Sequence, residues 1–238
     1  MKNMQQFLGK EYKISVYYRK DEGKQKMKEK VKEFIVKNLK WIILFICLIG
    51  FLAIAEDVFN KEIMNGDIIG YKLISTFLIS DFATPIAKFI TNFGGAIFLA
   101  VLTIVLFILI KNKKIGVSIF SNLVIITALN QLLKNILQRP RPTEYRIIEE
   151  TGYSFPSGHS MISMAFYGYI IYLIYKYVKN KYIKWISIVL LSILICSIGI
   201  SRIYLGVHYT SDVLGGFLIS VSYLVIYISA VNKFLIEK

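Results

Sequence analysis

The sequence predicts an all-α protein that crosses a membrane several times. Its mean hydropathy is +0.57, and 55% of its 238 residues are hydrophobic, which is too apolar for an ordinary soluble domain. Only 18% of the residues are charged, and they cluster between long apolar runs. Such runs suit helices that cross the ~30 Å hydrocarbon core of a bilayer. We therefore expect one membrane domain over residues 41–232, followed by a short tail, 233–238.

Residues 1–40 form a polar and basic segment before this domain. Two interpretations fit it. In one, Met27, Val31, Phe34 and Ile35 follow helical spacing and make 24–40 an amphipathic helix that leads into the membrane. In the other, which we prefer, the segment is a solvated basic tail that fixes the orientation of the first membrane helix. A cleavable signal peptide is not expected, because the first apolar run begins too far from the N-terminus.

Six apolar segments are predicted to be membrane-spanning helices. They are 41–55, 93–110, 115–133, 161–175, 185–200 and 213–231. Charged residues end several of them; Glu56 and Asp57 follow the first, and the basic run 111–114 separates the second from the third. An even number of spans puts both termini on the same side of the membrane.

A seventh apolar stretch, 68–80, is short, contains Lys72 and lies between Asp67 and Asp81. If it does not cross, the basic N-terminal segment shares one side with the basic loops 111–114 and 176–184. That side then carries most of the 29 basic residues and a minority of the 15 acidic ones. Basic loops favour the cytoplasmic side, so we predict cytoplasmic termini and a plasma-membrane location.

In this topology, residues 56–92 form an external segment of short interfacial helices and are a candidate lid. The loop 134–159 is also external. Three short motifs then lie on the external face, at the ends of predicted helices. They are Lys134-x6-Arg141-Pro142, Pro156-Ser157-Gly158-His159 and Ser201-Arg202-x5-His208-x3-Asp212, and they contain both histidines of the chain.

The first two motifs supply features that bind an anion. Lys134 ends the third span, and the prolines that follow force extended backbone and direct Arg141 away from the helix axis. Ser157 is a favourable N-cap, and Gly158 lets a ligand approach the backbone. The free N–H groups of the first turn favour a negatively charged ligand beside His159.

The third motif combines a cation with an imidazole and a carboxylate. His208 and Asp212 are four residues apart and share a helix face if the last helix has begun. Asp212 then accepts from one ring nitrogen and leaves the other free. Arg202 is six residues before His208, so the chain between them is expected to turn.

The composition argues against several other classes. The net charge of +14 does not indicate nucleic-acid binding, because the basic residues flank apolar runs and suit contact with anionic lipid. Cys47 and Cys196 lie inside apolar runs and form no Cys-x-x-Cys or Cys/His cluster. We expect no metal and no cofactor, because cationic side chains can neutralise a phosphoryl group. The sequence predicts no oligomeric state.

Over residues 90–230, the three motifs resemble the type 2 phosphatidic acid phosphatase (PAP2) family. Within it they resemble bacterial membrane phosphatases of phosphatidylglycerophosphate or undecaprenyl diphosphate. The resemblance implies that His208 is the nucleophile, Asp212 its orienting partner and His159 the general acid. It also implies that the substrate phosphate is bound by Lys134, Arg141, Ser157, Gly158 and Arg202.

The resemblance further implies a metal-independent lipid phosphatase with a phosphohistidine intermediate. Undecaprenyl diphosphate, phosphatidylglycerol phosphate and phosphatidic acid are the expected substrates. Arg139 and Arg146 add charge near the motif, which is a weak indication of a diphosphate. The alternative function is a catalytically silent lipid-phosphate transporter or scramblase, which would be expected to have lost His159, His208 or Asp212.

Overall fold

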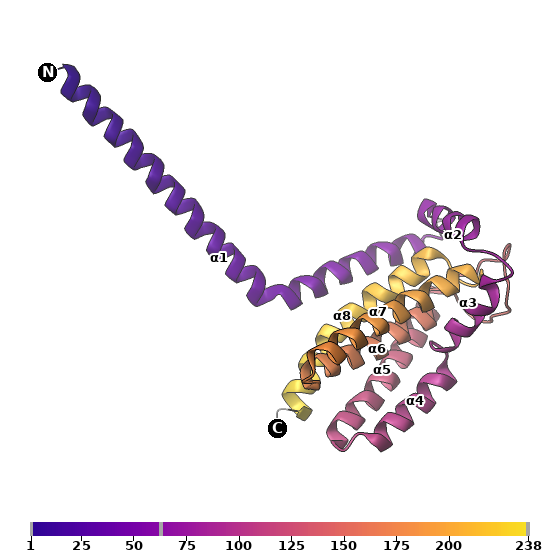
Figure 1. The fold of residues 1–238 in the computed structure, drawn as a ribbon. Helices are drawn as coiled ribbons and strands as arrows, with labels where there is room; N and C mark the ends of the chain where they lie inside the picture. Colours follow the sequence, from indigo (N-terminus) through magenta and orange to yellow (C-terminus); the bar gives the residue numbers. More distant parts are fainter. Residues whose placement is uncertain (1, 62–63, 237–238) are drawn as a thin grey trace. The chain divides into compact units, whose positions relative to one another are not determined.

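The computed structural model describes residues 2–61 and 64–236, and the side chains of 27–61 and 64–234. Residues 1, 62, 63, 237 and 238, which belong to the predicted N-terminal, external and C-terminal segments, lie outside this description. Within the described residues the chain forms eight α-helices and a C-terminal π-helical turn, Asn232–Ile236, without a strand (Figure 1). The prediction of an all-α protein is confirmed.

Two compact units make up the chain, residues 1–42 and 43–238. The first belongs to the long helix α1 (Lys2–Phe59). The backbone is helical through 24–40, as the amphipathic-helix interpretation requires, and Met27, Val31 and Phe34 are exposed. Contact of this helix with a membrane stays a prediction.

Among the described residues, four helical segments are long and apolar enough to cross a membrane. They are Met27–Phe59 within α1, α5 (Lys113–Leu137), α7 (Lys181–Tyr204) and a segment from Thr210 to Phe234 that contains α8 (Thr210–Val231). A bent pair, α3 (Ala83–Asn92) and α4 (Ala96–Leu109), adds a fifth if its two helices, which meet at 49°, form one broken span. The chain is thus a multi-pass helical protein, but the predicted number of six spans is not confirmed.

The two remaining predicted spans differ from expectation for separate reasons. The second begins late, because Gly94 and Gly95 interrupt the helix and leave α4 with 14 residues, too few to span alone. The fourth corresponds to α6 (Gly158–Tyr177), whose buried face carries serines and tyrosines that reduce its apolarity. Length and composition therefore do not mark α6 as a span.

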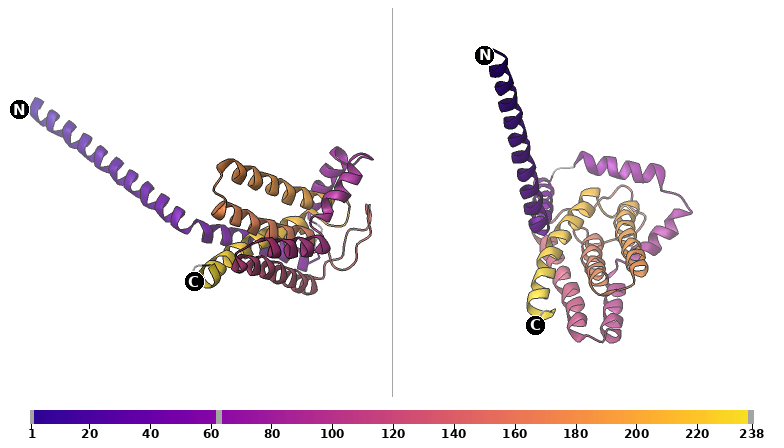
Figure 2. Two further views of the ribbon diagram at one scale, coloured as in Figure 1. Left: turned by 60° about the horizontal axis from the view of Figure 1, so that its bottom comes forward. Right: turned by 60° about the vertical axis from the view of Figure 1, so that its left-hand side comes forward.

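The helix α6 forms the centre of the second unit and packs against α5, α7 and α8 (Figures 1 and 2). Its core contacts include Phe166 and Tyr169, which are packed with Leu99 and Ile198. Buried hydroxyls find partners across helices; Tyr169 Oη donates to Ser118 Oγ at 2.8 Å. Such hydrogen bonds satisfy polar groups where water is scarce.

The described residues between α1 and α4 form two short helices, while the external, interfacial position predicted for 56–92 stays a prediction. The stretch 68–80 lies mainly in α2 (Asn65–Phe77), whose 13 residues are too few to cross a bilayer as a helix. Both α2 and α3 pack against α7, and α2 also packs against α8. At this contact a Cβ on Gly70 would lie 2.2 Å from Thr210 Oγ1, so α2 approaches the start of α8 closely.

Candidate active site

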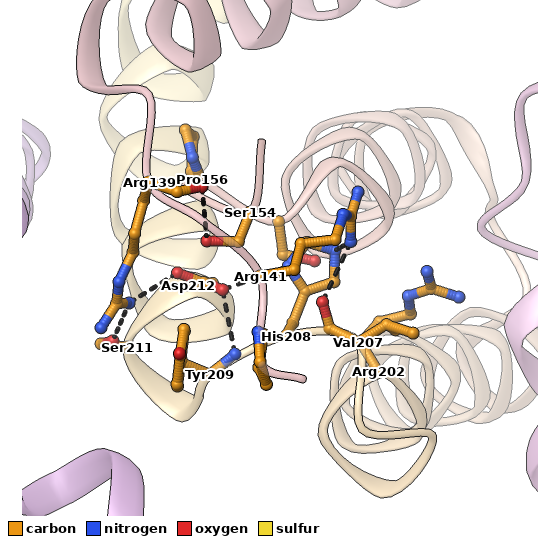
Figure 3. Close-up of polar contacts among 12 residues, drawn as sticks. Arg139, Arg141, Ser154, Pro156, Arg202, Val207, His208, Tyr209, Ser211 and Asp212 are labelled. Carbon is orange, nitrogen blue, oxygen red and sulfur yellow. Dashed lines mark hydrogen bonds and ion pairs between the residues drawn. The ribbon is translucent and has the colours of Figure 1, made fainter. Parts of the chain in front are cut away.

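The three motifs, which are up to 78 positions apart in the sequence, meet in one site, where Figure 3 shows Arg141, Pro156 and His208 close together. They come from the end of α5 and the loop after it, from the start of α6, and from the turn between α7 and α8. Ser157 N donates to Asp212 O at 3.0 Å, and Arg141 Nη1 lies 3.0 Å from His208 Nε2. The predicted convergence is therefore present in the fold.

The imidazole of His208 is held at both nitrogens. Its Nδ1 lies 3.2 Å from Oδ2 of Asp212, and its Nε2 lies 3.0 Å from Nη1 of Arg141. A guanidinium only donates hydrogen bonds, so Nε2 carries the lone pair and Nδ1 carries the proton. Burial, only partly offset by the hydrogen bond and charge of Asp212, lowers the pKa of His208 to about 4. The ring is thus neutral at physiological pH, with its lone pair directed toward Arg141.

Asp212 lies in the first turn of α8 and is fully buried. Its Oδ2 also accepts from Tyr209 N at 2.9 Å, which satisfies a free backbone donor at the helix start. The carboxylate therefore has two tasks, because it caps α8 and receives the proton of His208.

The predicted turn between Arg202 and His208 is present. The helix α7 ends at Tyr204, and Gly206 has a φ of +70°. A Cβ on Gly206 would lie 2.0 Å from Tyr145 O, so only glycine fits at this position. This turn returns the chain so that Arg202 and His208 lie in the same site.

Arg141 is anchored by main-chain carbonyls. Its Nε donates to Gly152 O at 3.0 Å, its Nη2 to Thr151 O at 3.1 Å, and its Nη1 to Val207 O at 3.0 Å. These bonds fix the guanidinium beside His208.

Arg202 is almost fully buried at the end of α7. Its Nη1 donates to Thr91 Oγ1 of α3 at 2.8 Å, and its Nη2 forms a short hydrogen bond with the Glu150 carboxylate. Within the described part of the chain, its Nε has no hydrogen-bond partner although it is buried. An unpaired buried donor is costly, so this atom is available for a ligand.

A carboxylate lies between the two arginines. Oε2 of Glu150 is 3.9 Å from Arg141 Nη2, in addition to the contact of Oε1 with Arg202. Burial acts to raise the pKa of Glu150, but Arg202 and Arg141 outweigh it and hold the pKa below its usual value. Glu150 is therefore an anion paired with the two arginines predicted to bind phosphate.

The start of α6 has the predicted cap. Ser157 is buried and its hydroxyl accepts from Ser160 N at 3.4 Å. Gly158 is close to α5, since a Cβ there would lie 3.1 Å from Asn130 Oδ1. His159 follows in the first turn, before the apolar part of α6, and is half-buried. Burial and the charge of Arg202 hold the pKa of His159 well below that of a free histidine.

Lys134 lies in the last turn of α5, as predicted, and is buried. Its ammonium forms a short hydrogen bond with the carbonyl of Tyr153, in the loop that leads to α6. Asn130, also on α5, donates a second hydrogen bond to this loop, from its Nδ2 to Pro156 O at 3.2 Å. The end of α5 is thereby tied to the chain that positions His159.

Sequence reasoning missed several contacts. It did not identify Glu150, Thr91 or Asp67, which have no fixed spacing from the motifs. It also placed Arg139 beside the phosphate site, whereas Arg139 is buried and paired with two carboxylates, Asp67 and Asp212. Arg139 therefore gives no support for a diphosphate, and a diphosphate substrate stays a prediction. Among the described side chains, those of 27–61 and 64–234, no group of three or more from His, Cys, Asp or Glu is placed to hold a metal ion.

Comparisons with known proteins identify the family. A family model described as the PAP2 superfamily matches residues 114–236. Phosphatidylglycerophosphatase B of Bacillus subtilis is 40% identical over 90 residues, which are 37% of this chain and 44% of that protein. The undecaprenyl-diphosphatase of Sulfolobus acidocaldarius is 27% identical over 195 residues, which are 77% of this chain and 86% of that protein.

A solved structure extends the match to the fold. The crystal structure of a transmembrane PAP2-type phosphatidylglycerolphosphate phosphatase from Bacillus subtilis has a TM-score of 0.71 and 26% sequence identity. The match covers 80% of this chain and 96% of that chain. The sequence match to phosphatidylglycerophosphatase B spans less than half of that protein's length. The structural match covers far more of both chains.

Proposed function

The chain belongs to the PAP2 superfamily as a multi-pass membrane phosphatase, and from that premise we propose that it removes phosphate from a membrane lipid through a phosphohistidine at His208. The observation that carries this proposal is the state of the His208 ring. Its Nδ1 faces Asp212, and its Nε2 accepts from Arg141. A neutral imidazole that is oriented by a carboxylate and has an unprotonated Nε2 is an activated nucleophile once phosphate replaces Nε2 as the partner of Arg141.

The proposed reaction has two steps. Nε2 of His208 attacks phosphorus, the bond from phosphorus to the lipid oxygen breaks, and His159 gives a proton to the leaving oxygen. Asp212 stabilises the positive charge that forms on the His208 ring. Water then attacks phosphorus while His159 removes one of its protons, the bond from phosphorus to Nε2 breaks, and inorganic phosphate leaves.

His159 is proposed to become protonated only when the substrate is bound. Burial and Arg202 disfavour the charged ring in the structure. A phosphate dianion beside the ring attracts a proton and reverses this preference. The general acid is thus formed when the substrate binds.

The phosphate oxygens are proposed to lie among Lys134, Arg141 and Arg202, at the N–H groups that follow Ser157 and Gly158. These cations neutralise the charge of the transition state, so the reaction needs no metal and no cofactor. Substrate must take the place of the Glu150 carboxylate on Arg202 and of the Tyr153 carbonyl on Lys134. The free Nε of Arg202 adds a donor for a phosphate oxygen.

The substrate is proposed to be a lipid phosphate in the outer half of the plasma membrane. Phosphatidylglycerol phosphate and undecaprenyl diphosphate are the first candidates, because relatives with those activities in their names match the chain. Phosphatidic acid is the third. The six-span topology, the cytoplasmic N-terminal segment 1–40 and the lid role of 56–92 belong to the same proposal and rest on the distribution of basic residues.

The test is phosphate release by purified full-length protein in detergent with EDTA. A panel of phosphatidylglycerol phosphate, undecaprenyl diphosphate and phosphatidic acid should contain at least one substrate that is turned over, with His208→Ala as the inactive control. A protein that binds these lipids without releasing phosphate would instead be a silent transporter or scramblase.

A further inference from the structure

Two buried carboxylates share one guanidinium behind the His208 ring. Nη1 of Arg139 donates to Oδ1 of Asp212 at 2.7 Å, and its Nη2 donates to Oδ2 of Asp67 at 2.7 Å. Figure 3 shows Arg139 reaching Asp212 from the side away from Arg141. Since Oδ2 of Asp212 faces His208, each oxygen of this carboxylate has its own cationic or proton-donating partner.

Ser211 completes the cluster. Its N–H donates to Oδ1 of Asp67 at 2.8 Å, and its hydroxyl donates to Oδ2 of Asp67 at 2.9 Å. The same hydroxyl accepts from Arg139 Nη1 at 2.7 Å. The guanidinium also lies over the ring of Tyr209, with 4.1 Å from Cζ to the ring centroid. Asp67 on α2 is thereby joined to the first turn of α8.

Burial makes this arrangement sensitive to charge. The side chain of Asp67 is 1% exposed and that of Arg139 is 7% exposed. Charges removed from water interact over longer distances than surface charges, and an unpaired buried charge is strongly unfavourable. Asp67 and Arg139 are therefore held as a pair, and their charges act on Asp212 and on the imidazole beyond it.

We propose that Asp67 and Arg139 are positioning residues for the phosphatase reaction, which orient Asp212 and set how readily His208 is protonated. This proposal rests on the proposed function. It extends the site to α2, which lies outside the matched residues 114–236. Their side chains form hydrogen bonds with each other, with Ser211 and with Asp212, so we infer that both act through Asp212.

The two residues should act with opposite sign. Loss of the negative charge in Asp67→Asn disfavours the His208 imidazolium and moves the acid limb of kcat/KM to lower pH. Loss of the positive charge in Arg139→Gln favours the imidazolium and moves that limb to higher pH. Each shift should be about 0.5 pH unit or more, given the strength of charge interactions in a buried site.

The variants leave the other charges around His208 in place. These are Asp212 from α8, Arg202 from α7, His159 from α6, Lys134 from α5, and Arg141 and Glu150 from the loop after α5. Because the phosphate ligands are unchanged, kcat should fall by about 10-fold or more while KM stays within about twofold.

The experiment measures pH profiles of kcat and kcat/KM for wild type, Asp67→Asn, Arg139→Gln and the double variant, with full-length protein in detergent. Relative to wild type, the acid limb of kcat/KM should move to lower pH in Asp67→Asn and to higher pH in Arg139→Gln. In the double variant it should return to the wild-type position. Asp81→Asn, which removes an exposed carboxylate near the start of α3, is the matched control and should leave the profile unchanged. Shifts of the same sign in both single variants, or no shift, would overturn the proposal.

A third substitution keeps the test decisive if Asp67→Asn does not fold. Arg139→Lys keeps the positive charge but loses the two-pronged donor, so its kcat should fall while its acid limb stays near the wild-type position. A limb that moves equally in Arg139→Lys and Arg139→Gln would contradict the charge effect. Failure of the proposed function is distinct, because wild type itself would then release no phosphate or would not depend on His208.

Discussion

Nε2 of His208 lies 3.0 Å from Nη1 of Arg141, while Nδ1 of the same ring lies 3.2 Å from Asp212. A donor on one side and a carboxylate on the other leave only one neutral tautomer, with the proton on Nδ1. The atom that must attack phosphorus is therefore already unprotonated and adjacent to a cation that binds phosphate. The predictions below depend on this arrangement.

The pH dependence of kcat/KM should be bell-shaped, with an acid limb well below the usual histidine range. The pKa of His208 is lowered to about 4, so the neutral nucleophile is lost only as the pH falls through that value. The alkaline limb reflects loss of the proton that the substrate and His159 share, and a phosphomonoester loses its second proton near pH ~6. Initial rates from pH 3 to 9 measure both limbs, and a flat profile would exclude the two-histidine scheme.

Arg141→Lys and Arg202→Lys should each lower kcat/KM by at least about 10-fold, because an ammonium cannot replace the planar fork of donors of a guanidinium. Arg141→Lys also loses the anchoring bonds to the carbonyls of Thr151, Gly152 and Val207. Arg202→Lys loses the Nε donor. Vanadate should inhibit wild type as a mimic of the transition state and should inhibit both variants more weakly. Equal vanadate inhibition of all three proteins would argue against a phosphate site between these side chains.

Glu150→Gln should lower KM and strengthen inhibition by inorganic phosphate. The carboxylate pairs with Arg202 and lies 3.9 Å from Arg141, so it competes with a phosphate for the same cations. A neutral amide competes less, and an effect of about threefold to tenfold is expected, since pairs with one partly exposed member are of modest strength. Glu149→Gln, at the exposed neighbouring position, is the control. A KM that rises in Glu150→Gln would mean that Glu150 supports Arg202 instead of competing with substrate.

The orientation in the membrane can be tested with single cysteines in a background where Cys47 and Cys196 are serine. Thr151 is exposed in the loop that carries the motif, and Asn112 is exposed at the start of α5. A membrane-impermeant thiol reagent added to intact cells should label Thr151→Cys and spare Asn112→Cys, because the basic loop at 111–114 favours the cytoplasm. The opposite labelling would place the substrate pool in the inner half of the membrane.

Much of the site follows from local sequence. Ser157 caps α6, Gly206 turns the chain after α7, and Asp212 lies in the first turn of α8, all as the motifs predict. Each of these depends on residues within a few positions of each other. Local rules of capping and backbone conformation were therefore sufficient to predict them.

The residues that sequence reasoning missed interact over long separations. Asp67 meets Arg139 across 72 positions, and Thr91 meets Arg202 across 111. No spacing rule relates them, because their proximity depends on how α2 and α3 pack against α7 and α8. The assignment of Arg139 to the phosphate site failed for the same reason, since its two carboxylate partners could not be seen in the sequence.

Length and composition do not confirm the six predicted spans, because apolarity does not distinguish a helix surrounded by lipid from one surrounded by protein. The helix α6 is enclosed by α5, α7 and α8, so serines and tyrosines such as Ser163 and Tyr169 can be buried in hydrogen bonds there. Length and composition therefore do not identify α6 as a span, although it lies among helices that they do identify.

The most direct test of the proposed mechanism is to trap the phosphoryl group of the substrate on His208. The bond that holds it should be labile in acid and stable in base. Wild-type protein is mixed with a lipid substrate that carries a radiolabelled phosphate, denatured within milliseconds and digested, and the labelled peptide is sequenced. The label should be on His208, should disappear in His208→Ala, and should accompany a loss of kcat of at least about 10³-fold in that variant. Label on another residue, or near wild-type turnover by His208→Ala, would contradict the proposed mechanism.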